Sequence, residues 1–129
     1  MDCNTFHQQF SIHPVGQGLF YSCTIKRNEK VVFRMVFDCG SKTKDAGQEE
    51  VAIYRDTDFL NEKVLDLLVI SHFDSDHVNH IGKLLEGGIK VKRLVMPFLT
   101  FEERLFLTLK VLEESDGYNG GHLHEAAAA

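Results

Sequence analysis

The sequence lacks the segments that mark membrane-spanning and exported proteins. No stretch of its 129 residues approaches the roughly 18 consecutive apolar residues that a membrane-spanning helix requires. The amino terminus, which begins Met1-Asp2-Cys3, does not have the basic and then apolar layout of a signal peptide. We therefore expect a soluble, cytoplasmic protein with no membrane segment in this chain.

Cysteine is scarce, and several sequence motifs of well-known enzyme classes are missing. Cys3, Cys23 and Cys39 are odd in number and widely spaced, a pattern that suggests neither a disulfide framework nor a cysteine zinc site. The chain has no G-x-x-x-x-G-K-[ST] phosphate loop and no G-x-S-x-G nucleophile elbow. The sequence thus favours neither a P-loop nucleotidase nor a serine hydrolase.

Acidic residues are concentrated in one part of the chain. The formal net charge is -5, but residues 45–77 alone carry nine acidic and two basic groups. A concentration of carboxylates in one place is compatible with neutralisation by metal ions, which reverse the local field. The charge pattern therefore has to be compared with the spacing of the candidate ligands.

The order of apolar runs and turn residues predicts an α/β fold. With 43% hydrophobic and 26% charged residues, the composition is that of a globular domain. Residues 10–27 are typical of a β-hairpin, and further strands are expected at 31–37, 64–70 and 89–96. Helices are expected at 49–60, from Val78 to the Gly87-Gly88 pair, and at 100–112, where Thr100 and Glu103 form a capping box. These elements predict a mixed sheet with helices on one face.

Four candidate metal ligands follow the predicted strand 64–70 directly: His72, Asp74, Asp76 and His77. Residues two apart in an extended segment project to the same side, so the first three could converge. The carboxyl end of a strand is where open α/β sheets place their sites, and imidazole with carboxylate suits zinc, manganese or iron. The alternative is an ordinary polar turn in which Asp76 caps the next helix and the histidines are solvated.

The run Ser71-His72-Phe73-Asp74-Ser75-Asp76-His77 resembles the H-x-H/D-x-D-H signature of the metallo-β-lactamase-fold hydrolases. The upstream run Asp38-Cys39-Gly40-Ser41 is similar to the D-x-G-S of the same family, and the expected elements come in the family's order. The resemblance covers roughly residues 10–112. It implies an αββα arrangement of layers, of which residues 1–116 would form the N-terminal half, with residues 117–129 as a flexible tail.

The resemblance also implies roles for individual residues. His72 and Asp74 would serve a first metal ion, and Asp76 and His77 a second, with Asp76 orienting the nucleophile. Asp38 would stand at the edge of the site and support the ligands. The implied cofactor is a pair of Zn²⁺ ions, with Mn²⁺ as the alternative, and the implied reaction is hydrolysis by a metal-bridging hydroxide.

The sequence departs from the common pattern at two positions. Asp74 stands where many members of the family have a second histidine, which resembles the ComEC-type and related nuclease-like branches and favours manganese as well as zinc. The implied substrate is therefore a phosphodiester, with nucleic acid as the partner, and Lys83, Lys90, Lys92 and Arg93 are candidates for contacts with phosphates. The second departure is His80, which lies three residues from His77 and could approach the site if both share one helix face.

A second hypothesis stays open on the sequence alone. The remaining ligands of the family come from a second half of the fold, and His122 and His124 lie in the glycine-rich tail, where they are poor substitutes. The chain could then be a truncated or degenerate hydrolase scaffold that acts as a non-catalytic binding or assembly module. Nothing in the sequence indicates the oligomeric state.

Overall fold

The computed structural model describes residues 3–59 and 62–113. The chain divides into two compact units, Met1–Pro97 and Phe98–Ala129, which are described separately below. The predicted tail at 117–129 and the pair His122 and His124 lie outside the described residues.

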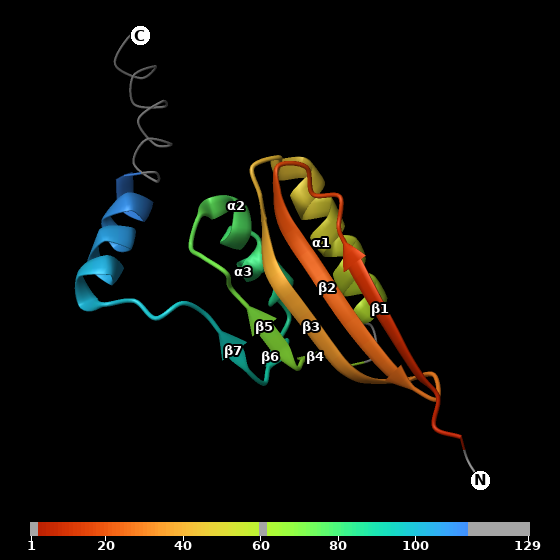
Figure 1. The fold of residues 1–129 in the computed structure, drawn as a ribbon. Coiled ribbons are helices and arrows are strands. Elements are labelled where there is room, and N and C mark those ends of the chain that lie inside the picture. Colours follow the sequence, from red (N-terminus) through yellow and green to blue (C-terminus); the bar gives the residue numbers. More distant parts are fainter. Residues whose placement is uncertain (1–2, 60–61, 114–129) are drawn as a thin grey trace. The chain divides into compact units, whose positions relative to one another are not determined.

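Three long strands open the first unit. β1 (Phe6–Ile12), β2 (Gly18–Arg27) and β3 (Lys30–Ser41) pair antiparallel in this order, as Figure 1 shows. The predicted hairpin and the third strand are confirmed, although β1 begins at Phe6 rather than at Phe10. The turn between β2 and β3 places Asn28 and Glu29 at positive φ, as tight hairpin turns require.

Two short strands extend this sheet in the parallel direction. β5 (Leu67–Val69) pairs with β3, and β7 (Leu94–Val95) pairs with β5, which gives the order β1-β2-β3-β5-β7. β4 (Val64–Leu65) and β6 (Lys90–Val91) form a separate two-stranded sheet. The predicted strands 64–70 and 89–96 are therefore each divided in two. At the first division, the Asp66 carboxylate accepts a hydrogen bond from the backbone N–H of Arg34 at 2.8 Å.

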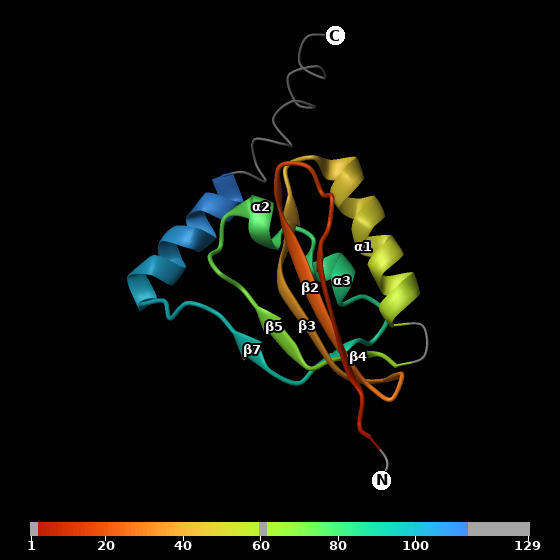
Figure 2. The ribbon, with the colours of Figure 1, turned by 45° about the vertical axis from the view of Figure 1, so that its right-hand side comes forward.

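Helix α1 (Lys44–Asp58) lies along one side of the sheet, as Figures 1 and 2 show. The core between sheet and helices is apolar, and its largest buried side chains include Phe20, Val36, Leu68, Val51, Tyr54 and Leu84. The helix begins five residues before the predicted start at Glu49. Residues 44–48 are small or polar and show no apolar periodicity, so the sequence pattern does not indicate this first turn. The expected α/β class with a mixed sheet is confirmed.

Two short helices follow β5 where one was predicted. They are α2 (Ser75–Val78) and α3 (Ile81–Leu84), with a break between them at Asn79 and His80. Leu84 of α3 is fully buried and joins the core. The break changes the direction in which side chains after Val78 point.

In the second unit, residues 101–113 are helical. The Glu103 side chain accepts a hydrogen bond from the backbone N–H of Thr100 at 2.8 Å, and the Thr100 hydroxyl accepts one from the N–H of Glu103 at 3.3 Å. The predicted capping box is thus confirmed.

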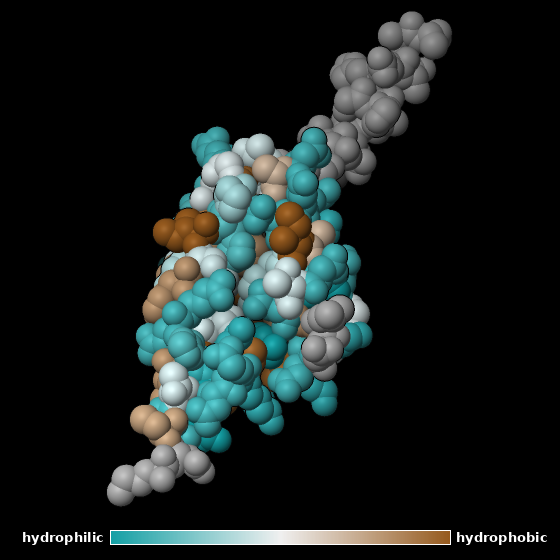
Figure 3. Space-filling view, turned by 90° about the vertical axis from the view of Figure 1, so that its right-hand side faces the viewer, coloured by the Kyte–Doolittle hydropathy of each residue, from teal (hydrophilic) through white to brown (hydrophobic). Residues whose placement is uncertain are grey.

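The part of the chain that the structure describes contains no helix with the length and apolar character needed to cross a membrane. On the face drawn in Figure 3, hydrophilic side chains predominate and apolar ones gather in separate small patches.

Candidate metal centre

The candidate centre lies where the parallel pairing of β3 with β5 ends. β3 and β5 run in the same direction, with Phe37 opposite Val69, so the residues that follow these two positions meet at one edge of the sheet. Asp38 follows on β3, and Ser71 and His72 come shortly after β5. The strand register therefore brings together groups that are more than 30 residues apart in sequence.

Helix α2 is held directly against the end of β3. The Asn79 amide accepts a hydrogen bond from the Ser41 N–H at 2.9 Å and donates one to the Ser41 carbonyl at 2.7 Å. A Cβ atom on Gly40 would lie 2.6 Å from backbone atoms of Asp76 and His77, so only glycine allows this approach. This close packing places His77 beside Asp38.

Three side chains form the tightest group of potential ligands among the described residues. One ligand atom each from Asp38, His72 and His77 lies within 4.8 Å of the other two. The two imidazole rings are 3.9 Å apart between centroids, with an interplanar angle of 48°.

Asp38 is the buried member of this group. Its side chain is fully buried, and its backbone adopts a φ of 54°, a left-handed conformation that aspartate tolerates better than most residues. The carboxylate receives hydrogen bonds from the Ser71 N–H at 2.7 Å, from the Ser71 hydroxyl, and from Nδ1 of His77 at 2.9 Å. A buried carboxylate with three donors is well suited to orient its neighbours.

Ser71 links Asp38 to the other histidine. Its Oγ donates a hydrogen bond to the Asp38 carboxylate and also lies 2.7 Å from Nδ1 of His72. The serine hydroxyl has one hydrogen, which forms the hydrogen bond to the carboxylate. His72 must therefore donate a hydrogen bond from its own Nδ1–H to Oγ. His77 likewise donates Nδ1–H to Asp38. In the neutral form of each ring, these hydrogen bonds select the tautomer whose Nε2 atom carries the lone pair that a metal ion needs.

The two predicted aspartate ligands lie next to these Nε2 atoms. Oδ2 of Asp74 is 3.4 Å from Nε2 of His72, and Oδ2 of Asp76 is 3.7 Å from Nε2 of His77. Neither aspartate belongs to the group within 4.8 Å, but each carboxylate faces the nitrogen of one histidine. Asp74, rather than Asp76, occupies the N-cap position of α2, and no side-chain capping bond is formed there.

His80 is placed apart from the centre. The break after α2 directs it into the interior, where it is 6% exposed and its Nε2 has no hydrogen-bond partner among the described residues. It packs so closely against α1 that a Cβ atom on Gly47 would lie 2.4 Å from that nitrogen. Burial, together with the positive charge of Lys83, lowers the pKa of His80 below its ordinary value.

The basic residues proposed for phosphate contacts are mostly distant from the centre. Arg93 and Lys92 precede β7, at the opposite ends of the parallel strands from Asp38 and His72. The ammonium group of Lys92 is also paired with Asp66 at 3.2 Å. These two side chains therefore give no support to a phosphate-binding surface beside the centre.

Sequence reasoning assigned no role to Ser71, although it lies within the quoted motif. Its function as a link depends on the pairing of β3 with β5, which no local pattern reveals. Comparisons of the chain with protein-family models, with curated proteins and with solved structures give no match.

Proposed function

We propose that this chain carries the metal centre of a hydrolase of the metallo-β-lactamase type, with αββα layers in the complete fold. The observation that carries the proposal is the hydrogen-bonded unit of Asp38, Ser71, His72 and His77. This unit fixes both imidazoles with Nε2 directed at a carboxylate. Such an arrangement holds metal-ligating histidines in many metal sites, where a carboxylate behind the ring fixes its orientation.

The donor set fits a divalent metal ion. His72 and His77 supply two neutral nitrogens, and Asp74 and Asp76 supply carboxylate oxygens next to them. Two imidazoles and two carboxylates suit zinc and also manganese. Asp38 is already occupied by three donors, so we assign it to positioning rather than to ligation.

A divalent ion held by these residues would lower the pKa of a coordinated water and withdraw charge from the oxygens of the substrate. The residues of the chain have separate tasks. His72 and His77 would hold the ion through Nε2, and Asp76, which lies next to Nε2 of His77, would accept a hydrogen bond from the attacking water and orient it. Asp74, whose side chain is 62% exposed, completes the site on the solvent side.

We infer a phosphodiester as the substrate, with a nucleic acid as its natural source. The exposed side of the centre supports this inference, because the His72 side chain is 45% exposed and an extended polymer could reach it. The carboxylates of the centre would repel a phosphodiester until their charge is offset by divalent ions. The substrate should therefore bind only to the metal-loaded protein.

The proposal is tested by metal binding and by hydrolysis with the same protein preparation. Calorimetric titration with Zn²⁺ and Mn²⁺ should show binding by the wild type and a loss of more than tenfold in affinity for His72→Ala and His77→Ala. His7→Ala is the matched control, because His7 lies on β1 outside the centre, with its Nε2 3.7 Å from the Glu29 carboxylate. Hydrolysis of bis-phenyl phosphodiesters, DNA and RNA is then measured with the metal-loaded protein.

Absence of metal binding at neutral pH would refute the proposed centre. Metal binding without hydrolysis of any phosphodiester would instead support the alternative, a non-catalytic scaffold that uses the metal for binding or assembly.

A further inference from the structure

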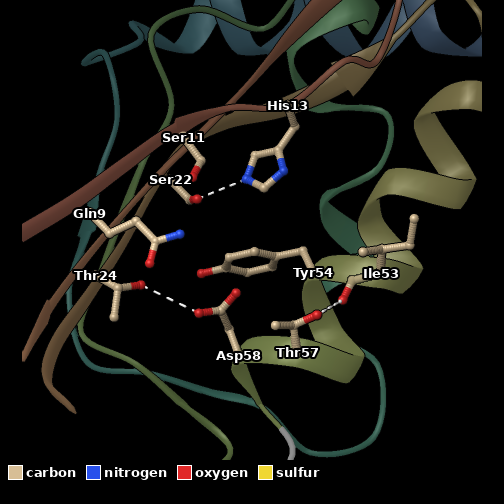
Figure 4. Close-up of a pocket in the computed structure, with 9 residues that line it drawn as sticks. All are labelled: Gln9, Ser11, His13, Ser22, Thr24, Ile53, Tyr54, Thr57 and Asp58. Atoms are coloured by element: carbon tan, nitrogen blue, oxygen red, sulfur yellow. Dashed lines mark hydrogen bonds between the residues drawn. The ribbon is translucent and has the colours of Figure 1, made fainter. Parts of the chain in front are cut away.

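A polar cavity of about 180 Å³ lies between β1, β2 and helix α1 (Figure 4). None of its lining residues belongs to the candidate metal centre. Five of them carry a hydroxyl group: Ser11, Ser22, Thr24, Tyr54 and Thr57. Gln9, His13 and Asp58 also line the cavity and have polar or ionisable side chains.

The polarity of this cavity is unusual for its place in the fold. The face of a sheet that a helix covers is normally apolar, and elsewhere on this face Phe20 and Val36 are fully buried. Around the cavity, however, polar side chains of β1 and β2 are directed toward α1 (Figure 4). Ser22 and Thr24 are only 5% and 7% exposed. Burying such groups is costly unless they have polar partners, and both have one: Ser22 Oγ lies 2.8 Å from Nε2 of His13, and Thr24 Oγ1 donates a hydrogen bond to Asp58 at 3.4 Å.

Tyr54 carries a buried hydroxyl that, unlike those of Ser22 and Thr24, has no polar partner among the described residues. Its side chain is 98% buried, and its hydroxyl has no hydrogen-bond partner among the described residues. The ring is fixed by edge-on contacts with Phe20 and Phe59, at 5.3 and 5.4 Å between centroids. Figure 4 shows the hydroxyl pointing into the cavity. Burial raises the pKa of Tyr54, so the hydroxyl stays protonated and can both donate and accept.

The charges around the cavity argue against a charged ligand. Burial raises the pKa of Asp58, and the nearby guanidinium of Arg34 acts in the opposite direction, so the protein itself supplies a cation for this carboxylate. Burial lowers the pKa of His13, which lies 3.5 Å from Glu50. An anion would be repelled by Asp58, and a cation would meet a carboxylate that already has positive neighbours.

We propose that this cavity binds a small uncharged polyol, of the size of glycerol or a monosaccharide. Hydroxyl groups both donate and accept, as does the Tyr54 hydroxyl, whereas an apolar ligand would leave that buried hydroxyl without a partner. The volume equals that of about six water molecules, which is the size range of such a ligand. The proposal is independent of the metal centre.

The test is an NMR titration of the full chain with glycerol, ribose and glucose, using putrescine and inorganic phosphate as charged comparisons. At about 10 mM, well above the dissociation constant of about 1 mM that a few hydrogen bonds would give, a neutral polyol should shift the amide signals of β1, β2 and α1. Tyr54→Phe removes one buried oxygen and should weaken binding about fivefold to tenfold, the value of one hydrogen bond. His72→Ala, in the metal centre, should bind the polyol as the wild type does.

The proposal is overturned if no neutral polyol shifts these signals, or if putrescine or phosphate binds better than all three. Equal polyol affinity in the wild type and Tyr54→Phe would also overturn it, since the buried hydroxyl would then play no part. Because Tyr54→Phe keeps the ring contacts with Phe20 and Phe59, its fold is preserved and a loss of binding can be attributed to the hydroxyl.

Discussion

Asp38 and His77 are 39 positions apart in the chain, yet Oδ2 of Asp38 lies 2.9 Å from Nδ1 of His77. The aspartate lies in β3 where its register with β2 shifts, and the histidine lies in α2, so this contact joins the sheet to the segment that carries the candidate ligands. It also decides which ring nitrogen faces outward. The orientation of His77 is thus a consequence of how α2 packs on β3.

Replacing Asp38 with asparagine should weaken metal binding without removing any ligand. The amide has almost the same shape, but it has no charge and offers one acceptor oxygen instead of two to the three donors around it. We expect a loss of about 10- to 100-fold in Zn²⁺ affinity by calorimetry, the usual cost of losing a group behind a metal-ligating histidine. Asp56→Asn, on the exposed side of α1, is the control and should bind as the wild type. Unchanged affinity in Asp38→Asn would contradict the positioning role.

Ser71→Ala should release the tautomer of His72 while leaving that of His77 in place. In the wild type, the serine Oγ accepts a hydrogen bond from Nδ1–H of His72 and donates its own hydroxyl hydrogen bond to Asp38. Nitrogen NMR of the metal-free protein should therefore show the Nδ1–H tautomer for both histidines, and a mixture for His72 alone in the variant. Ser71→Thr, which keeps the hydroxyl, should restore the wild-type spectrum. A single unchanged tautomer of His72 in Ser71→Ala would exclude this role of the serine.

His80 should make the folded state sensitive to mild acid. Burial, followed by the charge of Lys83, lowers its pKa in the folded state below the ordinary value of 6.5. Between these two pKa values the unfolded chain binds more protons, so the free energy of unfolding falls as the pH decreases below about 6.5. Urea unfolding of His80→Gln should show a smaller loss of stability over this pH range. If wild type and variant lose stability in parallel, His80 does not titrate in this way.

The sequence locates the candidate centre because its candidate ligands are close together in the chain. His72, Asp74, Asp76 and His77 directly follow an apolar run, and the end of a strand is where such sites occur. The network behind the ligands could not be predicted. It depends on the pairing of Phe37 with Val69, which sets Asp38 beside Ser71, and this register is a tertiary property.

The placement of His80 is a second case in which the local sequence pattern does not reveal the structure, here in a helical segment. A spacing of three residues from His77 suggests one shared helix face, but the helix ends at Val78 and a new one starts at Ile81. The apolar stripe of Val78, Ile81 and Leu84 does not reveal this break. Likewise, the first turn of α1 has no apolar periodicity, and its position follows from packing, since Gly47 lies against His80.

Two glycine substitutions should distinguish the effect of disturbing the close contact between α2 and β3 from the general effect of adding a methyl group. In Gly40→Ala, the new Cβ would lie 2.6 Å from backbone atoms of Asp76 and His77, which cannot rotate away as a side chain would. Helix α2 must then move, and we expect a loss of about 1–3 kcal/mol in unfolding free energy together with weaker metal binding. In Gly82→Ala, no atom lies within 4 Å of the new Cβ, and alanine in a helix should add about 0.5–1 kcal/mol. Urea unfolding of both variants gives the comparison. Wild-type stability and metal affinity in Gly40→Ala would mean that α2 does not rest on β3, and the contact between Asp38 and His77 would then lose its structural basis.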